Sequence, residues 1–319
     1  MVIYIFKPKT ISLNEKNRFI NPVYILNQYA LISTIENDII FRNKNQLDPL
    51  FCCGVVKKFG QSVHNIKENE VVSYISKNLD LNIILPSNLI FKMKEYNPKL
   101  ISILPYASYG MKILRETNPK LSQNLLIFGF NMFSFLLSKI LVKSGANIHI
   151  LKLSNDNYSY DLEKEKDIDV INIDDYIQNQ INKIRIDKII LMTDLNQIIL
   201  EAVIHLHNKF ESLEIFDIGV NHQKKKEQGK IKINQISRYN IDFINSNYKK
   251  SVYYPYDYMR WDYKRNLQYF IQLIEQNKIV LDFINPMQVN VKNLDELKEQ
   301  FPHIMDKIPG KLILFKLQN

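Results

Sequence analysis

LLIFGFNMFSFLLSKILVKSGANIHILKL, the stretch from Leu125 to Leu153, decides the fold. Its opening residues, up to Gly129, form an apolar run that is typical of a buried parallel strand. A second apolar segment of helical length follows, and Gly145-Ala146 separates it from another strand-like run. A strand, a glycine turn, a helix and a second strand together form the layout of a nucleotide-binding crossover unit.

The same alternation continues on both sides of this stretch. Between the strands, helices are expected over Met132–Ser144, Asp174–Ile184 and Gln197–Phe210. Strands that alternate with helices predict a parallel sheet covered on both faces, which is a doubly wound α/β domain. The expected strands are Asn124–Gly129, Asn147–Leu153, Ile168–Ile173, Asp187–Thr193, Leu213–Gly219 and Lys230–Ile236.

The two ends of the chain follow different patterns. Short strands separated by polar turns predict a β-rich domain at the start, with strands at Val2–Phe6, Val23–Ile32, Gly54–Phe59 and Val71–Ile75. Near the end, DYKRNLQYFIQLIEQNK predicts an amphipathic helix, IVLDFI a strand, Leu294–His303 a helix, and GKLILFKL a strand that returns to the first sheet. We expect a β-rich, catalytic-type domain at residues 1–115, a nucleotide-binding domain at 116–237, and a C-terminal segment at 238–319 that returns to the first domain.

Composition excludes several classes of function. Basic residues exceed acidic ones by 42 − 33 = 9, but they are interleaved with acids, and the run Lys224-Lys225-Lys226 is typical of a solvated loop rather than a nucleic-acid site. The adjacent Cys52 and Cys53 suit neither a disulfide nor a zinc array. Gly129 and Asn131 break the apolar run before it could span a bilayer, and the first ten residues alternate like a strand, so we expect a cytoplasmic protein without membrane contact.

The turn after the first strand of the crossover differs from the usual phosphate-binding loop. In the pattern Gly-x-Gly-x-x-Gly the first glycine makes the turn, the second admits the pyrophosphate, and the third allows close packing of helix and strand. Gly129 keeps the first role, whereas Asn131 and Ser134 stand in the second and third positions. Asparagine places a side chain near the phosphate, while serine is small enough for packing. The helix N-terminus still offers amides to an anion, so all three are candidate cofactor contacts.

The ribose-binding position carries a lysine. In dinucleotide-binding folds an acid near the end of the second strand binds the ribose diol. Counting from Gly145-Ala146 places Lys152 there. Lysine accepts no hydrogen bonds, which disfavours NAD, but it can pair with the 2′-phosphate of NADP. The alternative is a surface lysine that remains after the site has lost its ligand.

Segments along the whole chain resemble the medium-chain dehydrogenase/reductase family. CCGVVKKFGQSVHNIKENEVVSY is similar to its Gly-Val-Val element and following turn, with Asn69-Glu70-Val71 where the family has Gly-Asp-x. LPYASYGMKIL is similar to the helix before the cofactor domain, VKSGANIHIL to the Lys-x-x-Gly-Ala before the second strand, and LEIFDIG to a strand that ends in glycine. The resemblance implies a GroES-like β-rich domain plus a doubly wound Rossmann domain, with Thr193 and Gly219 among the cofactor contacts.

One stretch, YYPYDYMRWDYKRNLQYFIQLIEQNKIVL, resembles a narrower subgroup, the oxidoreductases found with surface-polysaccharide genes. That subgroup has an Arg-Trp followed by an Arg-Asn, which here are Arg260-Trp261 and Arg265-Asn266. The resemblance implies a small carbonyl compound or an activated sugar as substrate. Arg260 could clamp a carboxylate or phosphate of such a substrate, or it could hold the domain junction beside Trp261.

The resemblance also bears on the chemistry. The family's first zinc ligand is expected near LISTIENDII, which has no cysteine, and its His-Glu pair near SYISKNLDLNII, which has no histidine. We therefore expect no metal. The zinc-free branch needs a bound nicotinamide and at most one acid. Glu36 is the candidate acid, and the alternative is an exposed loop carboxylate.

Two hypotheses remain open. The first is a zinc-independent, NADP(H)-dependent oxidoreductase that transfers hydride to a small carbonyl or activated-sugar substrate in surface-polysaccharide synthesis. The second is a degenerate, non-catalytic family member that serves as a subunit or a binding module and has lost its cofactor. Either would form a homodimer or pair with an oxidoreductase subunit, with Leu213–Ile236 as the predicted dimer edge.

Overall fold

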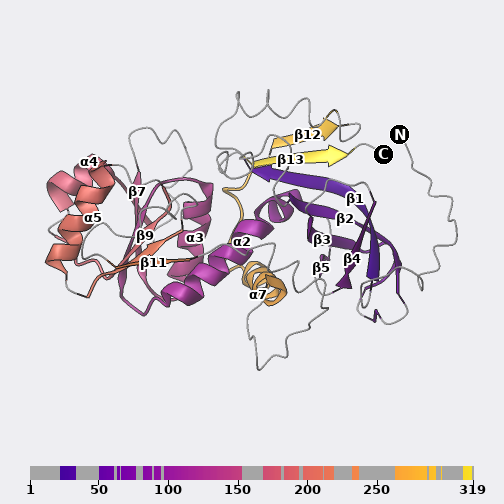
Figure 1. Cartoon of the computed structure of the whole chain (residues 1–319), viewed down its shortest axis with the longest axis horizontal. Coiled ribbons are helices and arrows are strands. Elements are labelled where there is room, and N and C mark those ends of the chain that lie inside the picture. Colours follow the sequence, from indigo (N-terminus) through magenta and orange to yellow (C-terminus); the bar gives the residue numbers. More distant parts are fainter. Residues whose placement is uncertain are drawn as a thin grey trace. The chain divides into compact units, whose positions relative to one another are not determined.

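The structure of the protein is a computed structural model (Figure 1). It describes residues 22–33, 50–60, 63–64, 66–76, 82–87, 90–94, 97–152, 168–180, 183–193, 197–210, 212–218, 232–236, 263–285, 287–291, 296 and 312–317. The chain divides into two compact units. One comprises residues 1–105, 239–272 and 284–319, and the other comprises residues 106–238 and 273–283. The roles expected for residues 1–115, 116–237 and 238–319, a catalytic-type domain, a nucleotide-binding domain and a returning segment, stay predictions.

The second unit contains a six-stranded parallel sheet, as the alternating pattern predicts. Its strands lie in the order β11-β10-β9-β6-β7-β8, and every neighbouring pair is parallel. The strands are β6 (Asn124–Phe128), β7 (Asn147–Lys152), β8 (Ile168–Asn172), β9 (Lys188–Leu191), β10 (Glu214–Asp217) and β11 (Ile233–Gln235). This is a doubly wound sheet, in which the chain moves outward in both directions from β6.

Helices cover both faces of this sheet (Figure 1). On one face, α4 (Ile173–Asp175) and α5 (Gln197–Lys209) pack with alternate strand residues in a single apolar cluster. On the other lies α3 (Met132–Val142), which follows β6 and packs beside β7. Every residue of α3 from Met132 to Leu141 is buried, including Ser134, Ser138 and Lys139. The apolar run is therefore explained by a buried helix.

The first unit contains a seven-stranded sheet in the order β12-β13-β1-β2-β3-β5, with β4 also paired to β1. All pairs are antiparallel except β12 with β13. The last strand returns to the first sheet, as expected, because Ser33 pairs with Leu312 and Tyr29 with Lys316. The strands are β1 (Pro22–Ser33), β2 (Leu50–Phe59), β3 (Val71–Ser76), β4 (Asn82–Pro86), β5 (Ile90–Lys92), β12 (Met287–Val291) and β13 (Leu312–Leu317).

Two further helices complete the fold, α2 (Pro98–Thr117) and α7 (Tyr263–Glu275). Within the second unit, α2 approaches α3 closely at Gly110, where an added Cβ would lie 2.7 Å from the Ile140 Cδ1 atom. None of the helices in the described ranges is both long and apolar enough to cross a bilayer.

Two expected elements differ from the structure. The helix expected at Asp174–Ile184 is instead the short α4 followed by a π-helical turn, η4 (Tyr176–Gln180). The structure has no strand at Ile279–Ile284, where one was expected: Ile279, Leu281 and Ile284 are buried, but the segment pairs with neither sheet. The expected strand at Val2–Phe6 lies outside the described residues.

Candidate functional site

The strand order creates a switch point beside β6. The chain continues from β6 to β7 and β8 on one side, and then returns to β9 and β10 on the other. In open α/β sheets, ligands bind outside the carboxyl ends of the strands at such a point. Gly129 directly follows β6, and Thr193 lies two residues after β9. Both predicted cofactor contacts thus lie at this edge of the sheet.

Gly129 occupies a position that requires glycine. Its φ is +104°, a conformation that other residues rarely adopt, and its N–H donates to the Leu151 carbonyl over 3.1 Å. A Cβ at this position would lie 3.2 Å from the Thr193 Cβ atom. The turn therefore needs glycine for its conformation and for space, and Thr193 packs against it.

Asn131, in the second position of the loop, is the N-cap of α3. Its backbone is extended, with φ −147° and ψ 177°, so it does not use the left-handed region that asparagine tolerates. Its Oδ1 atom accepts a hydrogen bond from the Ser134 N–H over 2.9 Å. In return the Asn131 N–H donates to the Ser134 Oγ atom over 2.8 Å. This reciprocal pair is a capping box, which stabilises the start of a helix.

Ser134 completes the third position of the loop. Its side chain is fully buried, and its hydroxyl also donates to the Asn131 carbonyl over 2.8 Å. It is therefore small enough for the close packing of α3 that the third glycine usually permits. The N–H groups of Met132 and Phe133, which lie between the two capping residues, donate to no acceptor within the described residues. These two amides are the ones that the helix start still offers to an anion.

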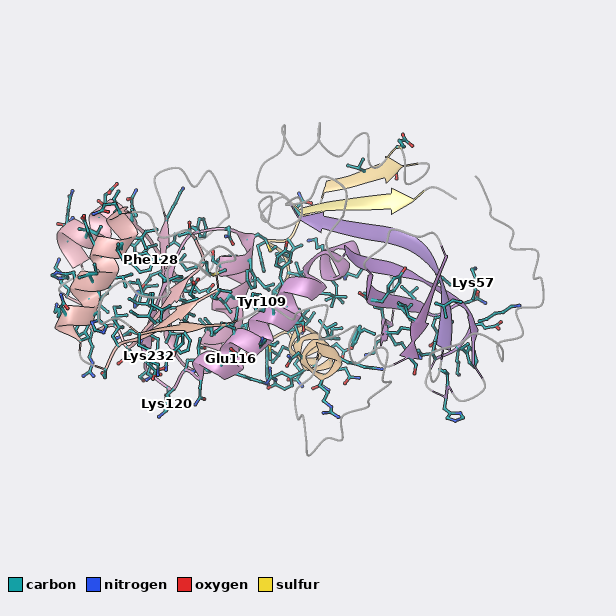
Figure 2. The ribbon with its side chains drawn as sticks, viewed as in Figure 1. Lys57, Tyr109, Glu116, Lys120, Phe128 and Lys232 are labelled. Atoms are coloured by element: carbon teal, nitrogen blue, oxygen red, sulfur yellow. The ribbon has the colours of Figure 1, made fainter. Side chains whose placement is uncertain are left out.

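The apolar side chains of the loop are packed into the protein. Phe130, Met132 and Phe133 are each at most 4% exposed. The Phe133 ring stacks on Tyr109 of α2, with ring centroids 5.6 Å apart (Figure 2 labels Tyr109). The Tyr109 hydroxyl in turn donates to the Ile236 carbonyl over 2.9 Å, just past β11. Aromatic packing thus connects the start of α3, α2 and the end of the sheet.

Lys152 is the last residue of β7 and lies beside the glycine turn. Phe128 pairs with Leu151, so the next residues along the two parallel strands, Gly129 and Lys152, are neighbours. The Lys152 side chain is half-buried. The structure therefore brings Gly129, Asn131, Ser134, Lys152 and Thr193 together at one edge. Glu36, Arg260 and Gly219 lie outside the described residues.

Sequence reasoning missed two residues near this edge. Asp217 ends β10 and is 3% exposed, although acids are rarely so deeply buried. Its signal in the sequence was an acid within the apolar segment LEIFDIG. Tyr109 was missed because a tyrosine in an apolar helix does not reveal that its hydroxyl reaches another element.

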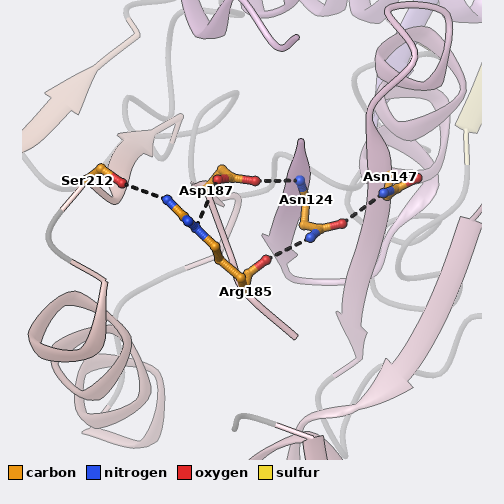
Figure 3. Close-up of polar contacts among 5 residues, drawn as sticks. All are labelled: Asn124, Asn147, Arg185, Asp187 and Ser212. Atoms are coloured by element: carbon orange, nitrogen blue, oxygen red, sulfur yellow. Dashed lines mark hydrogen bonds and ion pairs between the residues drawn. The ribbon is translucent and has the colours of Figure 1, made fainter. Parts of the chain in front are cut away.

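The opposite, amino edge of the sheet is joined by a polar network (Figure 3). The Asn124 side chain donates to the Arg185 carbonyl over 2.8 Å and accepts from the Asn147 amide over 2.9 Å. The Asn124 N–H donates to Asp187, whose carboxylate also pairs with the Arg185 guanidinium. Arg185 reaches the Ser212 hydroxyl as well. These contacts join β6, β7 and β9 at their starts, and we assign them a structural role.

The described residues contain no cluster of three or more histidine, cysteine, aspartate or glutamate side chains that could hold a metal ion. The segments where the family's zinc ligands are expected are only partly described, so zinc independence stays a prediction.

Comparison of the whole chain with solved structures gives close matches in shape. CurK enoyl reductase matches with a TM-score of 0.68 and 11% identity, over 95% of this chain and 93% of that chain. An alcohol dehydrogenase superfamily protein from Novosphingobium aromaticivorans matches with a TM-score of 0.65 and 12% identity, over 93% and 92%. The chain has the medium-chain dehydrogenase/reductase fold.

A third match is CurA from Vibrio vulnificus, whose structure contains NADPH, with a TM-score of 0.57 and 12% identity over 93% of this chain and 90% of that chain. No protein-family model and no curated protein sequence matches the chain. The likeness therefore lies in the fold, a GroES-like domain with a Rossmann domain, and the role of the site has to be argued from its own residues.

Proposed function

We propose that the protein is a zinc-independent oxidoreductase that uses NADP(H). The observation that carries this proposal is the position of Lys152, which lies beside Gly129 at the switch point of a doubly wound sheet. A cation at this place suits the 2′-phosphate that distinguishes NADP from NAD. The fold shared with CurA, which binds NADPH, supports the same cofactor.

The residues of the edge fit such a cofactor in part. The Met132 and Phe133 amides would face its pyrophosphate, and Lys152 would face its 2′-phosphate. Thr193 would contact the part of the dinucleotide that passes over the strand ends. Asn131 leaves fewer amides for the pyrophosphate, because its side chain already accepts a hydrogen bond from the Ser134 N–H. When bound, the nicotinamide would supply a hydride. The protein would bind and orient it and exclude water from it.

The substrate and the setting are further parts of the proposal. We propose a small carbonyl compound or an activated sugar as substrate, with Glu36 as the acid and Arg260 as the anion clamp, in surface-polysaccharide synthesis. A homodimer, or a complex with an oxidoreductase subunit, in the cytoplasm would fit this role. The grounds for these parts are the motifs of the sequence.

Calorimetric titration with NADPH, and separately with NADH, tests the cofactor. We expect NADPH to bind more tightly than NADH, and Lys152→Asp to weaken NADPH binding by roughly tenfold or more, because a charge-assisted contact becomes a repulsive one. Lys143→Asp is the matched control, since Lys143 is an exposed lysine at the opposite end of α3. Equal weakening by both variants would reject a specific role for Lys152.

The second candidate is a non-catalytic family member, and one observation favours it. The loop satisfies the amides of Asn131 and Ser134 through their reciprocal pair, and Gly129, Phe130 and Met132 are buried within the protein. A site that has lost its cofactor would look similar. Absence of heat with either nucleotide at millimolar concentration would favour this candidate over the enzyme.

A further inference from the structure

The glycine loop provides an acceptor for one of its own amides. In a loop with glycine in the second position, the amides at the helix start are open to a phosphate. Here the Ser134 N–H is bonded to the Asn131 Oδ1 atom over 2.9 Å, and the Asn131 N–H to the Ser134 hydroxyl over 2.8 Å. Two of the four N–H groups from Asn131 to Ser134 are therefore already satisfied by neighbours in the loop.

The asparagine oxygen also changes the electrostatics of the helix start. A helix N-terminus attracts anions through its exposed amides and its dipole. The Asn131 carboxamide oxygen is the negative end of a dipole, and it accepts from the Ser134 amide, which directly follows the Met132 and Phe133 amides that the phosphate would face. A phosphate on these amides would have the Ser134 N–H as its next donor, and the Asn131 oxygen would compete with it there.

We propose that Asn131 limits the affinity of the loop for the cofactor, because its side chain competes with the dinucleotide phosphate for the Ser134 amide. This inference rests on the proposed NADP(H) function. The capping box stabilises α3 in the free protein, and cofactor binding requires the Asn131 side chain to release that amide or leaves the phosphate with fewer donors. The affinity of the loop is therefore set low by its own cap.

A series of substitutions at residue 131 separates the cap from the bulk of the side chain. Asn131→Gly keeps an acceptable N-cap and removes the competing oxygen, Asn131→Ala also removes the oxygen but caps poorly, and Asn131→Asp keeps the cap and adds negative charge. We expect NADPH affinity to rise about tenfold in the Gly variant, because the phosphate gains about one hydrogen bond to a charged group. In the Asp variant we expect it to fall about tenfold.

The thermal midpoint of each ligand-free variant supplies a second measurement. The proposal predicts that NADPH affinity and the thermal midpoint change in opposite directions among the variants. The Asp variant caps the helix well but binds NADPH most weakly. The Ala variant caps the helix worst but binds NADPH more tightly than the native protein. A purely structural role would instead make affinity fall together with stability. Asn97→Gly is the matched control, because the Asn97 side chain caps α2 by accepting from the Leu100 N–H over 3.1 Å and lies outside the parallel sheet and its glycine turn. It should leave NADPH affinity unchanged.

The outcomes separate the inference from the proposed function. Tighter binding by Asn131→Gly, with Asn97→Gly unchanged, supports both. Equal, measurable NADPH binding by the native protein and Asn131→Gly overturns the competition but leaves the NADP(H) function standing. No binding by any of the variants, including Asn131→Gly, overturns both.

Discussion

Asparagine takes several backbone positions in this protein that glycine usually occupies. The chain has 8 glycines among 319 residues, and its described non-glycine residues with positive φ are Asn69, Asn118, Ser122 and Asn277. Asparagine is among the side chains that tolerate this region best. Asn69, with φ 65°, stands where the resemblance places glycine, so the turn is retained with a different residue.

The Asn69 turn gives a first prediction. Its N–H donates to the Val56 carbonyl over 2.8 Å, which fixes the turn that leads into β3. We expect Asn69→Ala to lower the free energy of unfolding by about 1 kcal/mol, because alanine is strained at positive φ. Asn69→Gly should leave it nearly unchanged. Urea unfolding of both variants is the measurement, and an alanine variant as stable as the glycine one would contradict this account of the turn.

His149 gives a prediction of pH dependence. It lies in the middle of β7 and is 7% exposed. Burial lowers its pKa, and Asp169, whose Oδ2 atom lies 3.1 Å from Nδ1, opposes this effect. The net effect is a lowered pKa for His149, since the His149 and Asp169 side chains are not aligned as a hydrogen bond.

Because the folded pKa is below the unfolded value, the unfolded chain takes up the proton first as pH falls. Stability should therefore be unaffected by His149 above about pH 6.5 and should decline below it. His149→Met, which cannot be charged, should decline less between pH 7 and 5. Thermal melting of both proteins over this range measures the difference, and parallel curves would show that His149 does not contribute.

Among the elements, the crossover from β6 through α3 to β7 could be predicted from the sequence, but the hydrogen bonds of its glycine loop could not. Apolar runs and two glycines are enough to place the strands and the helix. The sequence showed that Asn131 and Ser134 replace glycines, but not that they bond each other, because that depends on side-chain orientation. The prediction of a regular helix at Asp174–Ile184 was wrong, because the π-helical turn at Tyr176–Gln180 has no distinct sequence pattern.

The glycine turn itself gives a prediction at this scale. Gly129→Ala should lower the free energy of unfolding by about 2 kcal/mol, because it combines positive φ with a close approach to Thr193. Gly145→Ala is the comparison, since Gly145 also has positive φ but its added Cβ would mainly meet the end of the exposed Leu121 side chain. It should cost less. Denaturant unfolding of the two variants decides, and a larger loss at Gly145 would contradict the role of Thr193.

At the scale of the whole molecule, the order of the elements predicted the fold better than any single motif. A β-rich start, an alternating middle and a returning final strand correspond to the two sheets and to the pairing of β13 with β1. The cofactor edge was predictable because the carboxyl ends of parallel strands share one side. The substrate residues were not, because Glu36 and Arg260 are placed by resemblance and lie outside the described residues.

The most direct test of the central claim is hydrogen exchange at individual amides, with and without NADPH. Because the proposed nucleotide site lies at the carboxyl edge, exchange of the Met132 and Phe133 amides should slow when NADPH is present. The amides of Asn124 and Asp187, at the amino edge, should not change. NADPH that leaves Met132 and Phe133 unprotected, or that protects the amino edge instead, would contradict the claim that this loop is the cofactor site.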